Sequence, residues 1–190
     1  MEYILIIIAA VFINNVILAQ FLGVCPFLGV SNKMSTATGM GLAVLFVITL
    51  ATIITFLVQT YILEPFGLGY LQTIAFILLI ATLVQMIEII LKKASPPLYQ
   101  SLGIFLPLMS TNCAILGVAI LVIQNNLNLL QATTTAAGTG LGFLLAMVIF
   151  AGLREQMELQ GTPKAMKGAP IAMITTGILA LAFMGFAGLV

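Results

Sequence analysis

The sequence predicts an all-α integral membrane protein with six transmembrane helices, arranged as two inverted repeats of three helices each. Composition indicates an integral membrane protein, because 62% of the 190 residues are hydrophobic and only 6% are charged. Soluble domains carry about 25% charged residues, so this chain has too few to cover a surface that faces water. Long apolar stretches give the number of helices, and a phrase that occurs twice gives the repeat.

A helix needs about 20 mainly apolar residues to cross a bilayer, and six stretches of the sequence are long enough. The separators between them are short and polar, and several contain proline, which lacks a backbone donor and ends a helix. No separator is long enough for a soluble domain, so residues 1–190 form a single membrane domain with halves of about 1–95 and 96–190. The predicted spans are 3–22, 38–60, 70–91, 100–123, 132–153 and 169–189.

The basic residues predict the orientation of the six helices. All of them fall in the loops after helices one, three and five, which lie on one side of the membrane. Short loops rich in Lys and Arg stay in the cytoplasm, so both termini should lie on the outer face. The basic residues are Lys33, Lys92, Lys93, Arg154, Lys164 and Lys167.

Two short phrases occur once in each half of the chain. Residues 25–29 and 113–117 share the pattern Cys-x-x-Leu-Gly and contain the only two cysteines. The pattern Gly-x-Gly-Leu follows at residues 39–42 and again at 138–141. With six spans, helices one and four run in opposite directions, so matched phrases indicate an inverted repeat. Such repeats often hold their functional site near the bilayer midplane, on interrupted helices; chance recurrence of Leu and Gly is the alternative.

The segments around Cys25 and Cys113 favour broken helices. Residues 3–30 are too many for one straight helix at about 1.5 Å per residue, and a bend between Gly23 and Gly29 is expected. Irregular backbone at membrane depth is tolerated only inside protein or along a water-filled cavity, so both cysteines should be buried in protein. Thiolates are soft ligands for iron–sulfur clusters, zinc or copper. Unpaired cysteines also serve as small buried hydrophobes, and spacing alone leaves both interpretations open.

The two cysteine motifs resemble those of a known family. Residues 21–29, which follow Asn14 and Asn15, and residues 109–117 are similar to its first and second cysteine motifs. The family contains the A subunit of the Rnf electron transport complex and the E subunit of the sodium-translocating NADH:quinone reductase. The similarity extends over the whole chain.

The resemblance implies a component of an ion-translocating oxidoreductase in the bacterial inner membrane, and not a complete enzyme alone. Cys25 and Cys113 would be two of the four thiolate ligands of an intramembrane [2Fe–2S] cluster, since four cysteines per cluster is the usual count. The other two would come from a homologous membrane subunit, similar to the E subunit of the Rnf complex. Electrons would pass between carriers on the ferredoxin and NAD side, coupled to movement of sodium or protons. Other subunits of the complex would be further partners.

Two other functions stay open at this point: a small inverted-repeat secondary transporter, and a non-redox scaffold subunit. No ionisable residue falls at the midpoint of a predicted span, although ion-coupled transporters often place one there. The near-zero net charge and the few basic residues argue against nucleic acid, and the absence of His excludes histidine-based metal sites. Arg154, Glu155 and Glu158 are expected to form a solvated helix end or a docking surface for a soluble subunit.

Overall fold

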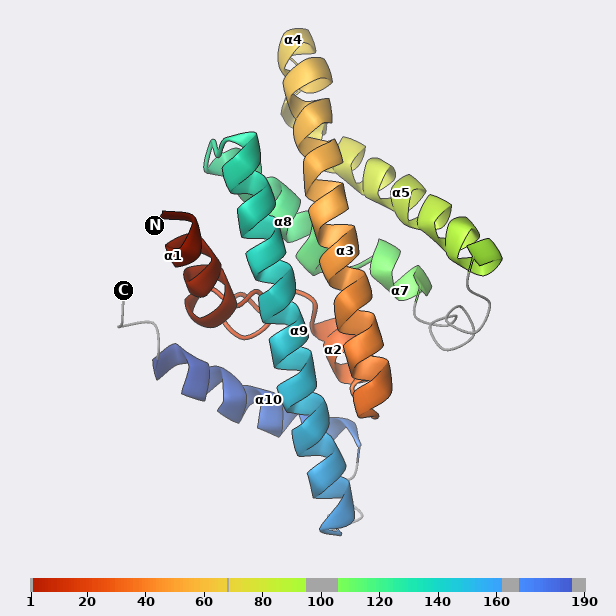
Figure 1. Cartoon of the computed structure of the whole chain (residues 1–190), viewed down its shortest axis with the longest axis vertical. Coiled ribbons are helices and arrows are strands. Elements are labelled where there is room, and N and C mark those ends of the chain that lie inside the picture. The colour runs from red at the N-terminus through yellow and green to blue at the C-terminus, as the bar shows by residue number, and fades with distance from the viewer. Residues whose placement is uncertain (1, 68, 95–105, 162–167, 186–190) are drawn as a thin grey trace.

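The computed structural model describes residues 2–67, 69–94, 106–161 and 168–185, and every regular element in these ranges is a helix (Figure 1). Two short π-helices and one 3₁₀ turn, labelled η, extend or connect the α-helices. The elements are α1 (Glu2–Ile8), η1 (Ala9–Ile13), α2 (Val24–Val30), α3 (Met34–Val58), η2 (Gln59–Leu63), α4 (Glu64–Phe66), η3 (Gly69–Leu71), α5 (Gln72–Ala94), α7 (Leu106–Ser110), α8 (Cys113–Gln124), α9 (Leu129–Leu159) and α10 (Ala169–Met184).

The long helices α3 and α9 lie side by side at the centre (Figure 1). Glycine lets them approach closely, as small residues do between membrane helices. A Cβ added at Gly41 would lie 2.6 Å from Leu144 Cδ1, and one at Gly140 would lie 2.8 Å from Leu45 Cδ1. Gly140 and Leu144 each lie 99 residues after their counterparts on α3. The two contacts are therefore equivalent under the same sequence offset that relates the Gly-x-Gly-Leu phrases.

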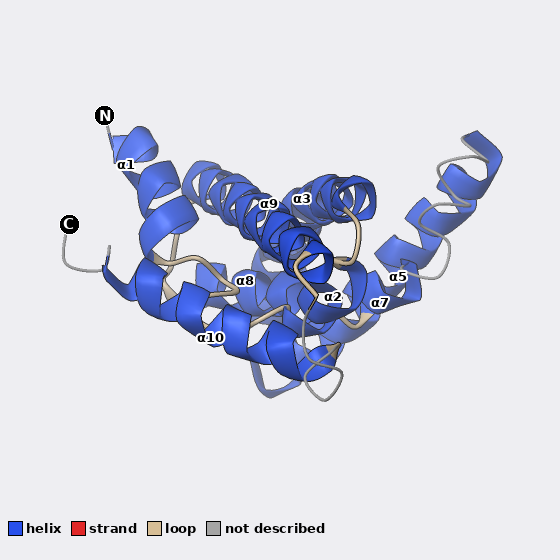
Figure 2. Ribbon diagram, turned by 90° about the horizontal axis from the view of Figure 1, so that it is seen from below, coloured by secondary structure: helices blue, strands red, loops and turns tan. Residues whose placement is uncertain are grey.

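The other helices surround this central pair unevenly. Figure 2 places α1 and α10 on one side of it and α5 on the other, where α5 projects away from the bundle. In α9, 56% of the most apolar 18-residue window is buried, against 22% in the window that contains most of α5. The core therefore lies around α3, α8 and α9. Its fully buried side chains include Phe27, Met40, Ile48, Phe143 and Met147.

Four helices in the described ranges are long and apolar enough to cross a membrane. They are Met34–Phe66, Gly69–Ile90, Pro107–Gln124 and Leu129–Leu159, and they correspond to the second through fifth predicted spans. Helix α10 is apolar but has only 16 residues; the predicted end of that span at residue 189 lies outside the described residues, as do residues 100–105 of the fourth span. The first predicted span differs from the structure.

The helix predicted over residues 3–22 ends at Ile13, where η1 ends. Turns and irregular backbone follow, until α2 begins at Val24. The predicted bend between Gly23 and Gly29 is therefore wrong, because most of that stretch is helical in α2. The irregular segment lies before it, between Asn14 and Gly23.

Asn15 explains why the irregular segment begins where it does. Its Nδ2 donates to the carbonyl oxygens of Val11, at 3.1 Å, and of Gly142 on α9, at 2.9 Å. Its Oδ1 accepts from the backbone N–H of Ile17 at 3.1 Å. Buried backbone groups must be paired, and this fully buried side chain replaces partners that a continuous helix would supply. A Cβ at Gly142 would lie 3.1 Å from Val11 Cα, so the glycine makes room for this contact.

Candidate functional site

The two cysteines lie at the beginnings of two helices. Cys25 is the second residue of α2, and Cys113 is the first residue of α8. Both thiols are free. Residue 23, just before α2, and residue 112, just before α8, determine how the two helices meet.

Gly23 brings the start of α2 against the start of α8. Its backbone N–H donates to Cys113 Sγ, with 2.9 Å between N and Sγ. Its φ of +81° is in the left-handed region, which glycine adopts without steric cost. A Cβ there would lie 2.9 Å from Phe143 Cε2 and 3.1 Å from Ala114 Cβ. Cys25 follows only two residues later, so the segment that carries it begins beside Cys113.

Asn112 caps the helix that Cys113 begins. Its Oδ1 accepts from the backbone N–H of Ala114 at 3.0 Å, the usual bond of a helix N-cap. Its Nδ2 is buried and has no hydrogen-bond partner among the described residues. Buried polar groups are nearly always paired. The site therefore contains a hydrogen-bond donor with unused capacity beside Cys113.

Cys25 and Cys113 differ in burial. Cys113 is half-buried, whereas Cys25 is exposed. The prediction that both lie buried in protein is therefore wrong for Cys25 in this chain. Cys25 lies on the exposed face of α2, because the buried face of the helix is formed by Pro26 and Phe27. In the part of the chain that the structure describes, no group of three or more Cys, His, Asp or Glu residues gathers at a metal-binding distance.

Arg154 is not the solvated residue that the sequence predicts. Its Nη1 donates to Leu28 O at 2.8 Å and to Ser31 Oγ at 2.9 Å, and its side chain is half-buried. Glu155 and Glu158 are exposed, as predicted. Arg154 lies one helical turn after Phe150 on α9, and this spacing is the available sequence signal, but it does not identify Leu28 or Ser31 as partners. The Gly23 bond to Cys113 has no sequence signal beyond the glycine itself.

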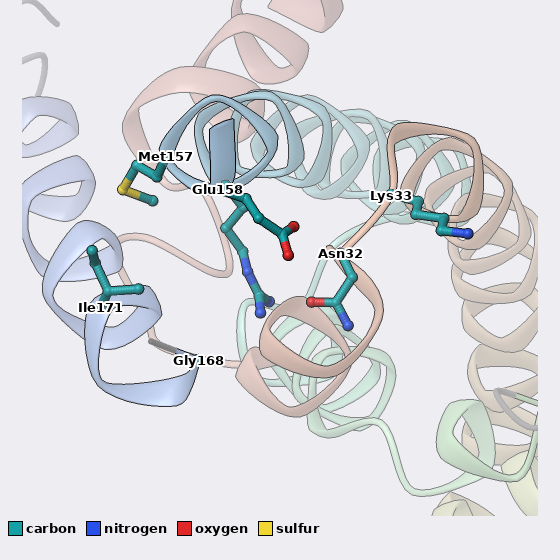
Figure 3. A pocket seen from close by; sticks show the side chains of 7 residues that line it. Asn32, Lys33, Met157, Glu158, Gly168 and Ile171 are labelled. Atoms are coloured by element: carbon teal, nitrogen blue, oxygen red, sulfur yellow. The ribbon is translucent and has the colours of Figure 1, made fainter. Parts of the chain in front are cut away.

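Two cavities of about 440 Å³ each adjoin α9. The first, on the side of the basic loops, is lined by Asn32, Lys33, Arg154, Met157, Glu158, Gly168 and Ile171. Figure 3 shows Asn32 and Glu158 turned toward it and Lys33 turned away. The second lies between η1, α8 and α9, and its polar lining residues are Asn14, Gln20, Asn125, Thr135 and Thr139.

In the described residues these features define a helical protein with one cysteine at the start of each of two helices, and with the residue before the first helix hydrogen-bonded to the thiol of the second. Residues 3–190 match the family described as "Rnf-Nqr subunit, membrane protein". The chain belongs to this family, whose match extends over nearly its full length.

Close relatives agree with this assignment. The chain is 57% identical over 189 residues to the A subunit of the Na(+)-translocating ferredoxin:NAD(+) oxidoreductase complex of Acetobacterium woodii, covering 100% of this chain and 98% of the relative. It is 60% identical over 186 residues to the A subunit of the ion-translocating oxidoreductase complex of Syntrophotalea carbinolica, covering 98% and 96%. Identity to the protein of the same name from Vibrio cholerae strain N16961 is 52% over 189 residues, covering 100% and 98%.

Proposed function

We propose that the chain is a membrane subunit of an ion-translocating ferredoxin:NAD or NADH:quinone oxidoreductase complex. In this complex it would hold half the ligands of an intramembrane [2Fe–2S] cluster, through Cys25 and Cys113. One observation carries the proposal: the Gly23 N–H donates to Cys113 Sγ at 2.9 Å, which brings the segment of Cys25 to Cys113. The names of the relatives supply the ion-translocating oxidoreductase complex, which in one relative is a ferredoxin:NAD(+) oxidoreductase; the NADH:quinone type comes from the family resemblance of the cysteine motifs.

The residues present fit such a group. Thiolates are the usual ligands of [2Fe–2S] clusters, and hydrogen bonds to the sulfurs tune the reduction potential. The Gly23 N–H already donates to one thiol. Asn112 Nδ2, buried and unpartnered among the described residues, is a second donor of the kind that cluster sulfurs accept. When bound, the cluster supplies a site that takes up and releases an electron within the membrane.

A homologous partner subunit follows from the ligand count. A [2Fe–2S] cluster uses four cysteines, and this chain has two. A similar membrane protein would supply the other two. Cys25 is exposed in this chain, so a partner chain has access to it. The chain alone is therefore not a complete enzyme, and the other subunits of the complex would provide the soluble carriers.

The proposed architecture is a 3+3 inverted repeat in the bacterial inner membrane, with helices one and four interrupted near the cysteines and both termini outside. Three observations support it. Cys25 and Cys113 take nearly the same position at the starts of α2 and α8. The glycine contacts between α3 and α9 obey one sequence offset. All six basic residues lie outside the predicted spans, in the segments assigned to the cytoplasmic side.

The test replaces Cys25 or Cys113 by Ser in the assembled complex. Loss of one thiolate in four should abolish or strongly change the paramagnetic signal of the cluster and reduce electron flow, and both positions should behave alike. Ala9→Ser is the control for adding a hydroxyl within the membrane. An unchanged signal and normal turnover in both cysteine variants would show that the thiols are packing residues.

Iron and sulfide analysis provides an independent measurement. The purified complex should contain acid-labile sulfide that is lost when this chain is omitted, and the chain expressed alone should lack a stoichiometric cluster. A scaffold subunit would change neither iron nor sulfide beyond its effect on assembly. A secondary transporter would carry a solute without any partner, and solute flux by the chain alone would contradict the proposal.

A further inference from the structure

An arginine on α9 binds the end of the helix that carries Cys25. Arg154 Nη1 donates to Leu28 O at 2.8 Å and to Ser31 Oγ at 2.9 Å. Leu28 lies in the last turn of α2, whose carbonyl groups have no partner within the helix. Ser31 is the C-cap residue directly after α2, and it is fully buried. A cation that donates to the last carbonyls of a helix stabilises that end.

A stack of aromatic rings joins the same two elements. Phe27 on α2 and Phe150 on α9 are both fully buried, and their ring centroids lie 4.3 Å apart at an interplanar angle of 21°. The Arg154 guanidinium carbon lies 5.9 Å from the centroid of the Phe150 ring. Hydrogen bonds and ring contacts therefore connect Arg154 to a residue two positions from Cys25.

The short length of α2 makes these contacts decisive for its position. Isolated helices shorter than about 12 residues are marginal in water, and α2 has seven. Its first end is fixed where Gly23 donates to Cys113 Sγ. Its second end is fixed by Arg154. With both ends held, the position of Cys25 relative to Cys113 is determined.

We propose that Arg154 is a positioning residue, which holds Cys25 at a fixed place relative to Cys113 through α2 without touching either thiol. The effect of Arg154 on the position of α2 follows from the hydrogen bonds and ring contacts described above. Its effect on a cluster rests on the proposed function. Arg154 also lines the cavity of about 440 Å³ on the side of the basic loops.

The first experiment needs no cluster. Nitroxide labels on the exposed Cys25 and on a cysteine introduced at the exposed position Thr111, two residues before Cys113, report the separation of α2 and α8 through dipolar broadening, in the full chain in membrane vesicles. The half-buried Cys113 is left unlabelled, so that its bond to Gly23 is kept. Arg154→Gln should raise the population of widely separated labels about tenfold, the change expected when hydrogen bonds from a charged group are lost. Arg154→Lys should restore part of the broadening. Lys33→Gln removes a nearby cation without these contacts and should change nothing.

The second experiment uses the assembled complex and reads the midpoint potential and the paramagnetic spectrum of the cluster. Both should shift in Arg154→Gln and recover partly in Arg154→Lys, whereas a merely structural role would change the amount of complex without shifting either. If Arg154→Gln does not assemble, Ser31→Ala decides, because it keeps the charge and removes one acceptor; it should shift both readouts in the same direction by less.

The two experiments separate this proposal from the proposed function. A label separation that responds to Arg154, in a complex whose wild type gives no cluster signal, would support the positioning role and refute the cluster. A wild-type cluster signal, with potential, spectrum and label separation all unchanged in Arg154→Gln or Ser31→Ala, would refute the positioning role and leave the cluster standing.

Discussion

Replacing Gly23 with Ala tests the junction between the two cysteine segments. The backbone there has φ +81°, and a left-handed conformation costs an L-residue about 1–2 kcal/mol. The new methyl group would also lie 2.9 Å from Phe143 Cε2 and 3.1 Å from Ala114 Cβ. Overpacking of this kind costs about 1–3 kcal/mol. Together the two effects predict a loss of about 2–5 kcal/mol in the free energy of unfolding.

Gly67→Ala is the matched control, because Gly67 has φ +63° and a Cβ there would meet nothing within 4 Å. It carries the backbone cost without the crowding. Unfolding of both variants in mixed micelles, followed by circular dichroism against denaturant, gives the difference. Gly23→Ala should be the less stable by about 1–3 kcal/mol. Equal stabilities would show that Phe143 yields freely, and the argument for a tightly packed junction would fail.

Three further outcomes are expected. Asn15→Leu removes three hydrogen bonds, two donated and one accepted, and should lower stability by about 1–3 kcal/mol; an unchanged unfolding midpoint would mean that water replaces the amide. Gly41→Ala and Gly140→Ala should each destabilise the α3 and α9 pair by about 1–3 kcal/mol through overpacking, and a large difference between them would contradict the equivalence of the two contacts. Reporter fusions after Lys93 should behave as cytoplasmic and those at Val190 as external, and a cytoplasmic Val190 fusion would overturn the orientation.

The sequence predicts the long helices well, because these depend on local apolar patterns. The repeated phrases likewise point to the close contact between α3 and α9. The apolar stretches locate α3, α5, α8 and α9. The Gly-x-Gly-Leu phrases identify the glycines that pack between α3 and α9, since only the smallest residue allows so close an approach. Asn128 and Gln131 form a capping box at the start of α9, a local signal that places the start at residue 129 rather than at the predicted 132.

Features that depend on distant partners are not predictable in the same way. The amide of Asn15 interrupts the first helix because it reaches Gly142 on α9, and no local pattern states that contact. The predicted break at Gly23–Gly29 follows from glycine and proline alone, yet Pro26 sits in the first turn of α2, where proline is tolerated. Sequence reasoning assigns Arg154 to solvent because charged residues at helix ends usually are solvated, and its buried partner Ser31 lies 123 residues away.

Four contacts of the first-half segment, between Asn15 and Ser31, are made with α9. Asn15 bonds to Gly142, Gly23 packs against Phe143, Phe27 stacks on Phe150, and Ser31 accepts from Arg154. The two series of residues increase together, so the segment follows α9 over twelve residues, or about 18 Å. Helix α9 belongs to the second half of the chain, as does Cys113. The second half therefore determines where the first half presents Cys25, and a substitution on α9 reaches the thiol pair without touching it.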